Sequence, residues 1–438
     1  MKLRLLAGAA CAALSVMSAP VSAATSPEIA SPSIVSGTAN PAVNAFYAAR
    51  RGAPLWLQAG ADSNAARELI GALRRAQLDG LSNGPALAAQ GQAMLARAQS
   101  GNPADVAAAD RFLSDAFVAY VSALQTPPAG MTYGDTWAMP QRDPAGTILA
   151  RAAAAQSLSS YVRKVSSVNP LYAQLRDAAW ATMQANGGQI DPRVQVSLER
   201  ARQMPFQNRY VMVDAASAKL YMIENGQIAD SMKVIVGSAD APTPMMASTI
   251  YYATVNPYWH VMPQLVQSLI APNVLSQGVE YLKRQGYQVQ AADGGEDAPL
   301  LDPTKVDWHA VAAGTEMVRV RQLPGPANSM GRVKIGFPNA QDIYLHDTPV
   351  KEKFELADRS LSHGCIRLED AERLSSWLMN GRDPIGSTSA PEANVKLPTP
   401  VPIYVTYLTA QARDGQLSFV DDNYGLDARR LSQIASLR

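Results

Sequence analysis

Apolar residues recur at helical spacing through the first half of the chain. Asn102 and Pro103 predict a helix start, because Asn can accept from a free backbone amide and proline is tolerated in the first turn. The residues that follow at spacings of three and four, and so form one apolar stripe, are Val106, Ala109, Leu113, Phe117 and Tyr120. The same periodicity predicts helices over 65–76, 146–164 and 170–186. We therefore expect residues 41–205 to form a helical domain.

From Arg209 onward the pattern becomes that of β-strands. The pair Asn225-Gly226 lies between two β-rich runs and tolerates the positive φ angles of a tight hairpin turn. Strands are predicted over 209–214, 220–223, 232–236, 249–256, 317–321, 332–337, 342–346 and 402–407. Short strands with few helices indicate an antiparallel or mixed β domain, a sandwich or barrel, over 206–438.

Residues 263–316 interrupt these strands. They have a polar, helical pattern and then become rich in Gly, Asp and Pro, with a flexible piece expected at 292–297. We expect an inserted helical subdomain that acts as a lid and excludes water from a cleft; the alternative is a surface decoration. The predicted fold class is therefore α+β, with an N-terminal helical scaffold domain and a mainly β domain, sandwich- or barrel-like, that carries the inserted lid.

The chain begins with the pattern of an export signal. Lys2 and Arg4 precede an apolar run over 5–17, and the small residues of 21–23 (VSA) suit a cleavage site. Residues 1–23 are therefore predicted to be a signal peptide that directs the protein to the periplasm. The Ser-, Thr- and Pro-rich residues 24–40 are expected to be a flexible leader.

Charge and hydropathy exclude some partners. The 438 residues carry a net charge of +1, and loss of Lys2 and Arg4 leaves 36 basic and 37 acidic residues, a net charge of −1. A near-zero charge without a basic run argues against nucleic acid as a partner. No later segment holds the roughly eighteen uncharged apolar residues of a transmembrane helix.

The exported chain is expected to keep one cysteine, Cys365, within Ser362-His363-Gly364-Cys365. A single thiol cannot form an internal disulfide, so it is either an inert buried group or a reactive nucleophile. A zinc site needs three or four ligands, and the histidines are scattered at positions 260, 309, 346 and 363. We expect neither a metal nor another cofactor.

A second reactive group lies on the strand over 342–346. Its side chains alternate, so Tyr344 and His346 share one face, and the nineteen-residue step to Cys365 allows a loop that brings the thiol back beside the strand. Residues 368–379 predict a helix, which would place Cys365 just before a helix N-terminus, where the pKa of a thiol is lowered and amides can bind an oxyanion. Gly364 lets the backbone approach a substrate closely. These are the groups that acyl transfer requires.

Three nearby residues keep two interpretations each. His363 either stabilises the turn or acts as a base, and Arg367 either binds a substrate carboxylate or pairs with Asp347 or Glu369. Trp259, in an aromatic cluster with Tyr258 and His260, either packs in a core or lines a binding cleft.

These residues carry a family resemblance. His346, followed sixteen residues later by Ser362-His363-Gly364-Cys365 and then Arg367, resembles the signature of the L,D-transpeptidase catalytic domain. Further segments that resemble the large Gram-negative branch of this family lie at 209–213, 242–244, 256–259, 331–334 and 344–349. Residues 46–56 resemble the helical scaffold of that branch, and 165–208 are too short for the small peptidoglycan-binding domain that the branch usually carries.

The resemblance implies a periplasmic enzyme that cross-links peptidoglycan. Cys365 would attack the carbonyl of diaminopimelate in a donor stem peptide, and the amine of an acceptor stem would then take the acyl group. His346 would be the base, oriented by the carbonyl of Asp347, and the amides of Gly364 and Cys365 would hold the oxyanion. The resemblance places substrate binding at Tyr344, Ser362, His363, Arg367 and Trp259. It also implies that carbapenem-type inhibitors acylate Cys365.

Two alternatives remain on the sequence alone. The same thiol and imidazole could serve an L,D-carboxypeptidase or an amidase that releases lipoprotein from the wall, both with water as acceptor. A non-catalytic peptidoglycan-binding protein is the other, although a complete Cys, His and Gly set argues against it.

Overall fold

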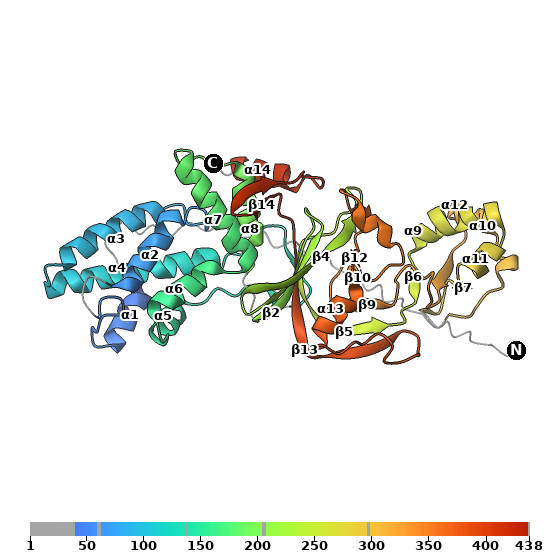
Figure 1. The fold of residues 1–438 in the computed structure, drawn as a ribbon, viewed down its shortest axis with the longest axis horizontal. Helices are drawn as coiled ribbons and strands as arrows, with labels where there is room; N and C mark the ends of the chain where they lie inside the picture. The colour runs from blue at the N-terminus through green and yellow to red at the C-terminus, as the bar shows by residue number, and fades with distance from the viewer. Residues whose placement is uncertain (1–39, 59–62, 136–137, 204–206, 296–297, 437–438) are drawn as a thin grey trace, which may run out of the picture. The chain divides into compact units, whose positions relative to one another are not determined.

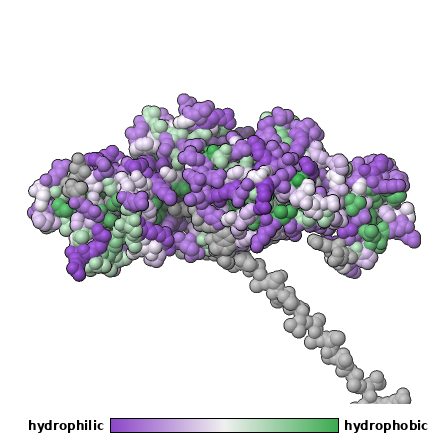
Figure 2. Space-filling model, turned by 60° about the horizontal axis from the view of Figure 1, so that its bottom comes forward, coloured by the Kyte–Doolittle hydropathy of each residue, from purple (hydrophilic) through white to green (hydrophobic). Residues whose placement is uncertain are grey.

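The computed structural model describes residues 40–436, apart from 59–62, 136–137, 204–206 and 296–297. The predicted signal peptide, all of the predicted leader except its last residue, the boundary predicted at 205–206 and part of the piece at 292–297 lie outside the described residues. Among the helices that are described, none is both long enough and apolar enough to span a membrane. The face drawn in Figure 2 is largely hydrophilic, and its hydrophobic residues lie in small separate groups.

Helices occupy the first half of the chain. They are α1 (Pro41–Ala49), α2 (Asn64–Arg75), α3 (Gly84–Ala98), α4 (Pro103–Leu124), α5 (Ala145–Ala153), α6 (Leu158–Ser167), α7 (Pro170–Ala185) and α8 (Pro192–Ala201). The predicted start of α4 is confirmed, since the Asn102 side chain accepts from the Ala104 amide at 2.9 Å. The single helix predicted over 146–164 is wrong: Ser157 caps a new helix by accepting from the Ser160 amide, so α5 and α6 are separate.

One large sheet forms the centre of the second half of the chain, and it also takes in one short strand, β1 (Thr132–Tyr133), from the first half (Figure 1). Its other strands are β2 (Arg209–Asp214), β3 (Lys219–Glu224), β4 (Gln227–Gly237), β5 (Met246–Val255), β9 (Val333–Gly336), β10 (Tyr344–His346), β11 (Ser360–Ser362), β12 (Ile366–Leu368) and β13 (Ala393–Thr406). The order β1-β5-β13-β2-β3-β4-β12-β10-β9 closes on itself because β9 also pairs with β5, and β11 pairs with β4. The predicted class is confirmed: a helical N-terminal region and a mostly β, barrel-like C-terminal region.

Alternation along the strands separates a core face from an outer face. On β9, β10 and β12 the fully buried residues Ile335, Leu345 and Ile366 belong to one hydrophobic cluster. Helix α13 (Ala371–Leu378) adds Leu374 and Leu378 to that cluster. Residues one position away on each strand therefore point to the opposite face, where the polar groups gather.

The segment 259–322, which includes the insertion predicted over 263–316, has a three-stranded sheet of its own and is not purely helical. It contains β6 (Trp259–Val261), α9 (Pro263–Leu265), a π-helical turn (Val266–Ile270), α10 (Ala271–Gln277), α11 (Glu280–Arg284), β7 (Tyr287–Ala291), a 3-10 turn (Pro303–Lys305), α12 (Trp308–Ala313) and β8 (Val318–Gln322). The strand predicted over 317–321 is β8, but it pairs with β6 and β7 and not with the main sheet. Residues 259–322, called the inserted subdomain below, also have a separate hydrophobic cluster around Ile270 and Ala271.

The chain ends in a tail that follows β13. It consists of β14 (Ala410–Arg413), β15 (Gln416–Phe419) and α14 (Leu426–Ser436). This tail packs against α7 and α8, so the last segment of the chain contacts the helices that precede the sheet (Figure 1).

Candidate active site

The sheet brings the candidate reactive groups together on its outer face. In the parallel pairing of β10 with β12, His346 is opposite Arg367, which places Cys365, two residues earlier, next to Tyr344. On the other side of β10, His346 is opposite Lys334 and Tyr344 is opposite Gly336. The nineteen-residue loop therefore returns the thiol beside the strand that carries the imidazole, as the spacing predicted.

Cys365 is partly buried, and its thiol is in the neutral, protonated form. Its Sγ donates to the carbonyl of Asp342 at 3.7 Å. Burial raises the pKa of the Cys365 thiol, and this effect outweighs the lowering by hydrogen bonds from Tyr344 and by the charges of Lys334 and Arg367. Burial, together with the neighbouring thiol, raises the pKa of the Tyr344 hydroxyl as well.

The prediction that a helix N-terminus activates the thiol is wrong. Cys365 leads into strand β12, which pairs with β4 and β10, and α13 begins only at Ala371. The helix cap is Asp370, whose side chain accepts from the Arg373 amide at 2.9 Å. Leu368 and the residues before it therefore follow the two-residue alternation of the sheet, and the helix dipole does not lower the pKa of this thiol.

His346 is buried, with 3 % of its surface exposed. Its Nδ1 lies 2.6 Å from the carbonyl oxygen of Asp347. A carbonyl can only accept, so Nδ1 carries the proton and Nε2 is left as the basic nitrogen. Burial and the charge of Arg367 lower the pKa of His346 to about 3, so the ring is neutral at pH 7.

Asp347 is held by its side chain so that its carbonyl faces the imidazole. Its carboxylate accepts from the Arg332 amide at 2.9 Å and pairs with the Lys351 ammonium at 2.8 Å. A Cβ on Gly331, whose φ is +60°, would lie 2.2 Å from the Asp347 carboxylate. Only glycine fits there, and the close approach fixes the residue that orients His346.

The turn before Cys365 uses Ser362 internally. The Ser362 hydroxyl donates to the Cys365 carbonyl at 2.6 Å and accepts from the Gly364 amide at 3.1 Å. Two expectations are therefore corrected: Ser362 is buried and engaged in the turn and does not face a substrate, and the Gly364 amide is not free to hold an oxyanion. Gly364 has φ +111°, a backbone conformation that favours glycine.

The surroundings of His363 and Trp259 bear on the two interpretations of each residue. Within the described residues the exposed His363 ring makes no hydrogen bond, so the expectation that it stabilises the turn is wrong. Trp259 packs against the core of the inserted subdomain, with its ring 6.2 Å from that of Tyr287. This packing supports the core interpretation of the aromatic cluster, and a contact between the partly buried Trp259 and a donor stem stays a prediction.

Two cations flank the thiol without a carboxylate partner in the described part of the chain. Arg367 is partly buried, which lowers the pKa of its guanidinium, and neither acid that could pair with it does so. Asp347 pairs with Lys351, and Glu369 pairs with Lys233. The Lys334 ammonium lies 4.5 Å from the centre of the Tyr344 ring. The sequence reasoning missed Lys334, although its position between the apolar Val333 and Ile335 places it on the outer face.

The ionisation state of this site predicts a pH dependence. We expect the rate of alkylation of Cys365 by iodoacetamide to keep rising with pH above the usual range of a thiol, because the thiolate is the nucleophile and its pKa is raised. Intact-protein mass spectrometry across pH 6–10 measures this rate. A plateau already reached near neutral pH would instead indicate a thiolate paired with an imidazolium.

Two segments of the chain match known protein families. Residues 208–403 match the L,D-transpeptidase catalytic domain, and residues 41–178 match the Scaffold domain. By this match, residues 208–403 are a domain of the L,D-transpeptidase catalytic-domain family. A candidate L,D-transpeptidase of Haemophilus influenzae is 26 % identical over 398 residues, which are 88 % of this chain and 78 % of the relative.

Solved L,D-transpeptidase structures are more distant. A mutant enzyme from Enterococcus faecium is 9 % identical with a TM-score of 0.23 and covers 45 % of this chain and 50 % of the other. L,D-transpeptidase 3 of Mycobacterium tuberculosis, with a faropenem-derived adduct, is 16 % identical with a TM-score of 0.23 and covers 45 % of this chain and 60 % of the other. The chain thus spans between half and two thirds of these proteins, and scores this low carry no weight for its fold.

Proposed function

We propose that this protein is a periplasmic L,D-transpeptidase that cross-links peptidoglycan stem peptides through an acyl-enzyme on Cys365. The observation that carries the proposal is the single sheet face that holds Cys365, Tyr344 and His346 between two cations without acidic partners. A thiol, a neutral imidazole and a binding site for negative charge are the groups that this reaction requires. The predicted signal peptide, outside the described residues, supports export.

In the first half-reaction the thiol attacks the carbonyl of diaminopimelate in the donor stem. As the S–C bond forms, Nε2 of His346 takes the thiol proton, and the Asp347 carbonyl holds the Nδ1 proton in place. The C–N bond to the terminal D-amino acid then breaks, and His346 returns the proton to the leaving amine. The neutral state of both groups at pH 7 suits this coupled transfer, but the thiol must first leave the Asp342 carbonyl.

Negative charge on the carbonyl oxygen needs donors close to the sulfur. The Tyr344 hydroxyl is one, because it hydrogen-bonds with the thiol and keeps its proton. The Cys365 amide is the second donor in this proposal, since the Gly364 amide is held by Ser362. His363, exposed beside the nucleophile, remains a proposed contact for the donor stem.

In the second half-reaction the side-chain amine of an acceptor stem attacks the thioester. The C–N bond forms, the C–S bond breaks, and the proton that the amine loses passes through His346 to the sulfur of Cys365. The test is incubation of the purified protein with disaccharide-tetrapeptides, followed by mass spectrometry of the products. Dimers linked through diaminopimelate support the transpeptidase, and their sequence gives the link type, three-three or one-three. Tripeptides alone would support the carboxypeptidase, and an inert wild type that a carbapenem does not acylate would support a non-catalytic binding protein.

The Arg367 side chain offers a test of donor binding. We expect Arg367→Lys to lower kcat/KM for the donor about 10- to 100-fold, because lysine keeps the charge but cannot form the bidentate pair with a carboxylate. Steady-state kinetics with a soluble stem peptide measure the change. The control is Arg332→Lys, because Arg332 is an exposed arginine directly before β9.

The substrate provides a second control for Arg367. A donor whose diaminopimelate carboxylate is amidated should be used equally slowly by the wild type and by Arg367→Lys. If the two proteins still differ on the amidated donor, Arg367 acts on something other than that carboxylate.

The inserted subdomain is proposed to be a lid over the acyl-enzyme. Its ends lie side by side, since Trp259 pairs with Gln322, so residues 259–322 can be replaced by a short Gly/Ser linker without stretching the chain. We expect this variant to keep Cys365 reactive towards iodoacetamide but to shift from cross-linked dimers towards hydrolysed tripeptides, because water reaches the thioester. An unchanged ratio of the two products, measured by mass spectrometry, would identify the insertion as a surface decoration.

A further inference from the structure

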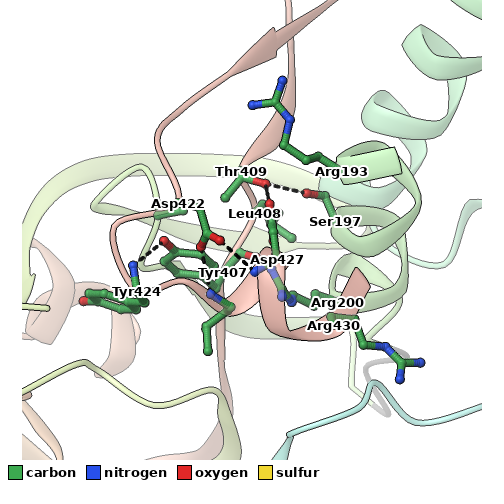
Figure 3. Close-up of polar contacts among 12 residues, drawn as sticks. Arg193, Ser197, Arg200, Tyr407, Leu408, Thr409, Asp422, Tyr424, Asp427 and Arg430 are labelled. Carbon is green, nitrogen blue, oxygen red and sulfur yellow. Dashed lines mark hydrogen bonds and ion pairs between the residues drawn. The ribbon is translucent and has the colours of Figure 1, made fainter. Parts of the chain in front are cut away.

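The tail after β13 reaches the turn that carries Cys365, although it lies beyond the residues that match the catalytic domain. Figure 3 shows the polar contacts of this tail with α8, and two of the labelled tyrosines come from the tail itself, Tyr407 and Tyr424. These contacts continue, residue by residue, to the backbone of Gly364.

At one end the tail is anchored to α8 by a buried ion pair. Arg200 and Asp427, whose side chains are 4 % and 3 % exposed, pair with each other. Asp427 also accepts from the Thr409 hydroxyl, and the Ala410 amide donates to Ser197 on α8 at 2.9 Å. A buried pair with its remaining oxygens satisfied holds its elements in one arrangement, because separating it leaves an uncompensated charge.

From this anchor the tail returns to the sheet through two stacked tyrosines. The rings of Tyr407 and Tyr424 lie 4.9 Å apart and are nearly parallel, at 18°. The Tyr424 amide donates to the Tyr407 hydroxyl at 3.0 Å, and Arg200 donates to the Tyr407 carbonyl at 3.1 Å. Tyr424 is therefore held in two ways, by the hydrogen bond of its backbone amide and by the stacking of its ring on Tyr407.

The Tyr424 hydroxyl forms hydrogen bonds with the backbone at the end of β4 and in the loop that leads to β5. It donates to the Gly237 carbonyl at 2.6 Å and accepts from the Thr243 amide at 3.5 Å. The Thr243 hydroxyl in turn accepts from the Gly237 amide at 2.8 Å and donates to the Gly364 carbonyl at 2.7 Å. All four hydrogen bonds are buried, so the loss of one partner leaves a polar group without a water to replace it.

We propose that Tyr424 is a positioning residue for the nucleophile, acting through Thr243 and Gly364. Gly364 has a positive φ and directly precedes Cys365, so its carbonyl direction sets the backbone from which the thiol projects. Holding that carbonyl fixes the attack geometry, and a displacement on the order of 1 Å costs up to about 100-fold in rate. This role rests on the proposed function of Cys365.

The test compares an oriented reaction of Cys365 with one that needs no orientation. The rate of acylation by a carbapenem, followed by intact-protein mass spectrometry, reports attack geometry, whereas alkylation by iodoacetamide reports access and thiol ionisation. We expect Tyr424→Phe, which keeps the stacked ring, to lower the acylation rate about tenfold and to change alkylation less than about twofold. Tyr120→Phe removes a hydroxyl as deeply buried, bonded to Asp79, and is expected to leave both rates unchanged.

Substitutions at Thr243 test the route. Thr243→Val should lower acylation at least as far as Tyr424→Phe, and Thr243→Ser, which keeps the hydroxyl, should restore it to within about threefold of wild type. Because Tyr424 acts through Thr243, adding Tyr424→Phe to Thr243→Val should lower the rate no further than about twofold.

The outcomes separate this inference from the proposed function. Acylation of Tyr424→Phe within about threefold of wild type, or an equal fall in alkylation, overturns the positioning role while Cys365 remains the nucleophile. Fully additive losses in the double variant, or equal rates for Thr243→Ser and Thr243→Val, overturn the route through Thr243. A wild type that the carbapenem does not acylate contradicts both proposals.

Discussion

Cys365→Ser is expected to reduce cross-linking roughly a thousandfold or more while the protein stays folded. A serine hydroxyl has a far higher pKa than a thiol, so His346 takes a proton from serine much less readily than from cysteine. The fold should tolerate the change, because the sulfur's hydrogen bond to a protein carbonyl is a long one of 3.7 Å, to Asp342. Mass spectrometry of the dimers measures the product.

Thermal unfolding separates lost chemistry from lost folding. Cys365→Ser should melt within a few degrees of wild type, which corresponds to roughly 1 kcal/mol or less in a chain of this size. Cross-linking above a tenth of the wild-type rate would show that another group can form the acyl-enzyme and that the proposed nucleophile is wrong.

His346→Ala is expected to lower the rate of acylation about 10²- to 10⁴-fold, the usual contribution of a general base. The neighbouring thiol then has no group to take its proton, and its own raised pKa leaves little thiolate at pH 7. The rate of carbapenem acylation, measured against pH, tests this reason directly. The variant should recover part of its activity at high pH, where the thiol ionises without a base.

Two other histidines serve as comparisons. His309, exposed on α12 of the inserted subdomain, should be replaceable by alanine without effect on the rate. His363→Ala should cost far less than His346→Ala and leave the melting temperature unchanged, since its exposed ring has no hydrogen bond among the described residues. A larger loss from His363→Ala than from His346→Ala would show that the base has been assigned to the wrong histidine.

Periodicity predicted the parts of this fold in which one face is buried. The strands around His346 alternate apolar and polar residues because Leu345 and Ile335 pack in the core while Lys334 and His346 face outward. That alternation, with the step from His346 to Cys365, predicted a loop that brings the thiol back beside the strand of His346, which the pairing of β10 with β12 confirms. The cap at Asn102 and the hairpin at Asn225-Gly226 were predictable for a different reason: each depends only on residues adjacent in sequence.

Long-range pairing explains most of the errors. Residues 366–368 become a strand because β4 and β10 pair with them, a preference that is invisible in a short segment followed by helix-forming residues. Strand β8 joins the inserted subdomain for a similar reason, since its partners are β6 and β7. The roles of Ser362 and Tyr424 depend on hydrogen bonds to backbone atoms. Because every residue has these backbone atoms, the spacing of residue types in the sequence cannot reveal such bonds.

The place of β13 in the sheet has a consequence for biosynthesis. This strand lies between β2 and β5 and pairs with both, yet it is the last strand of the sheet to emerge. During synthesis, the edges of β2 and β5 that face β13 stay unpaired until the chain has been made up to residue 406, and exposed edges are prone to aggregation. A chain that stops before residue 393 therefore cannot close its sheet, and the growing protein carries two exposed strand edges until β13 pairs with them.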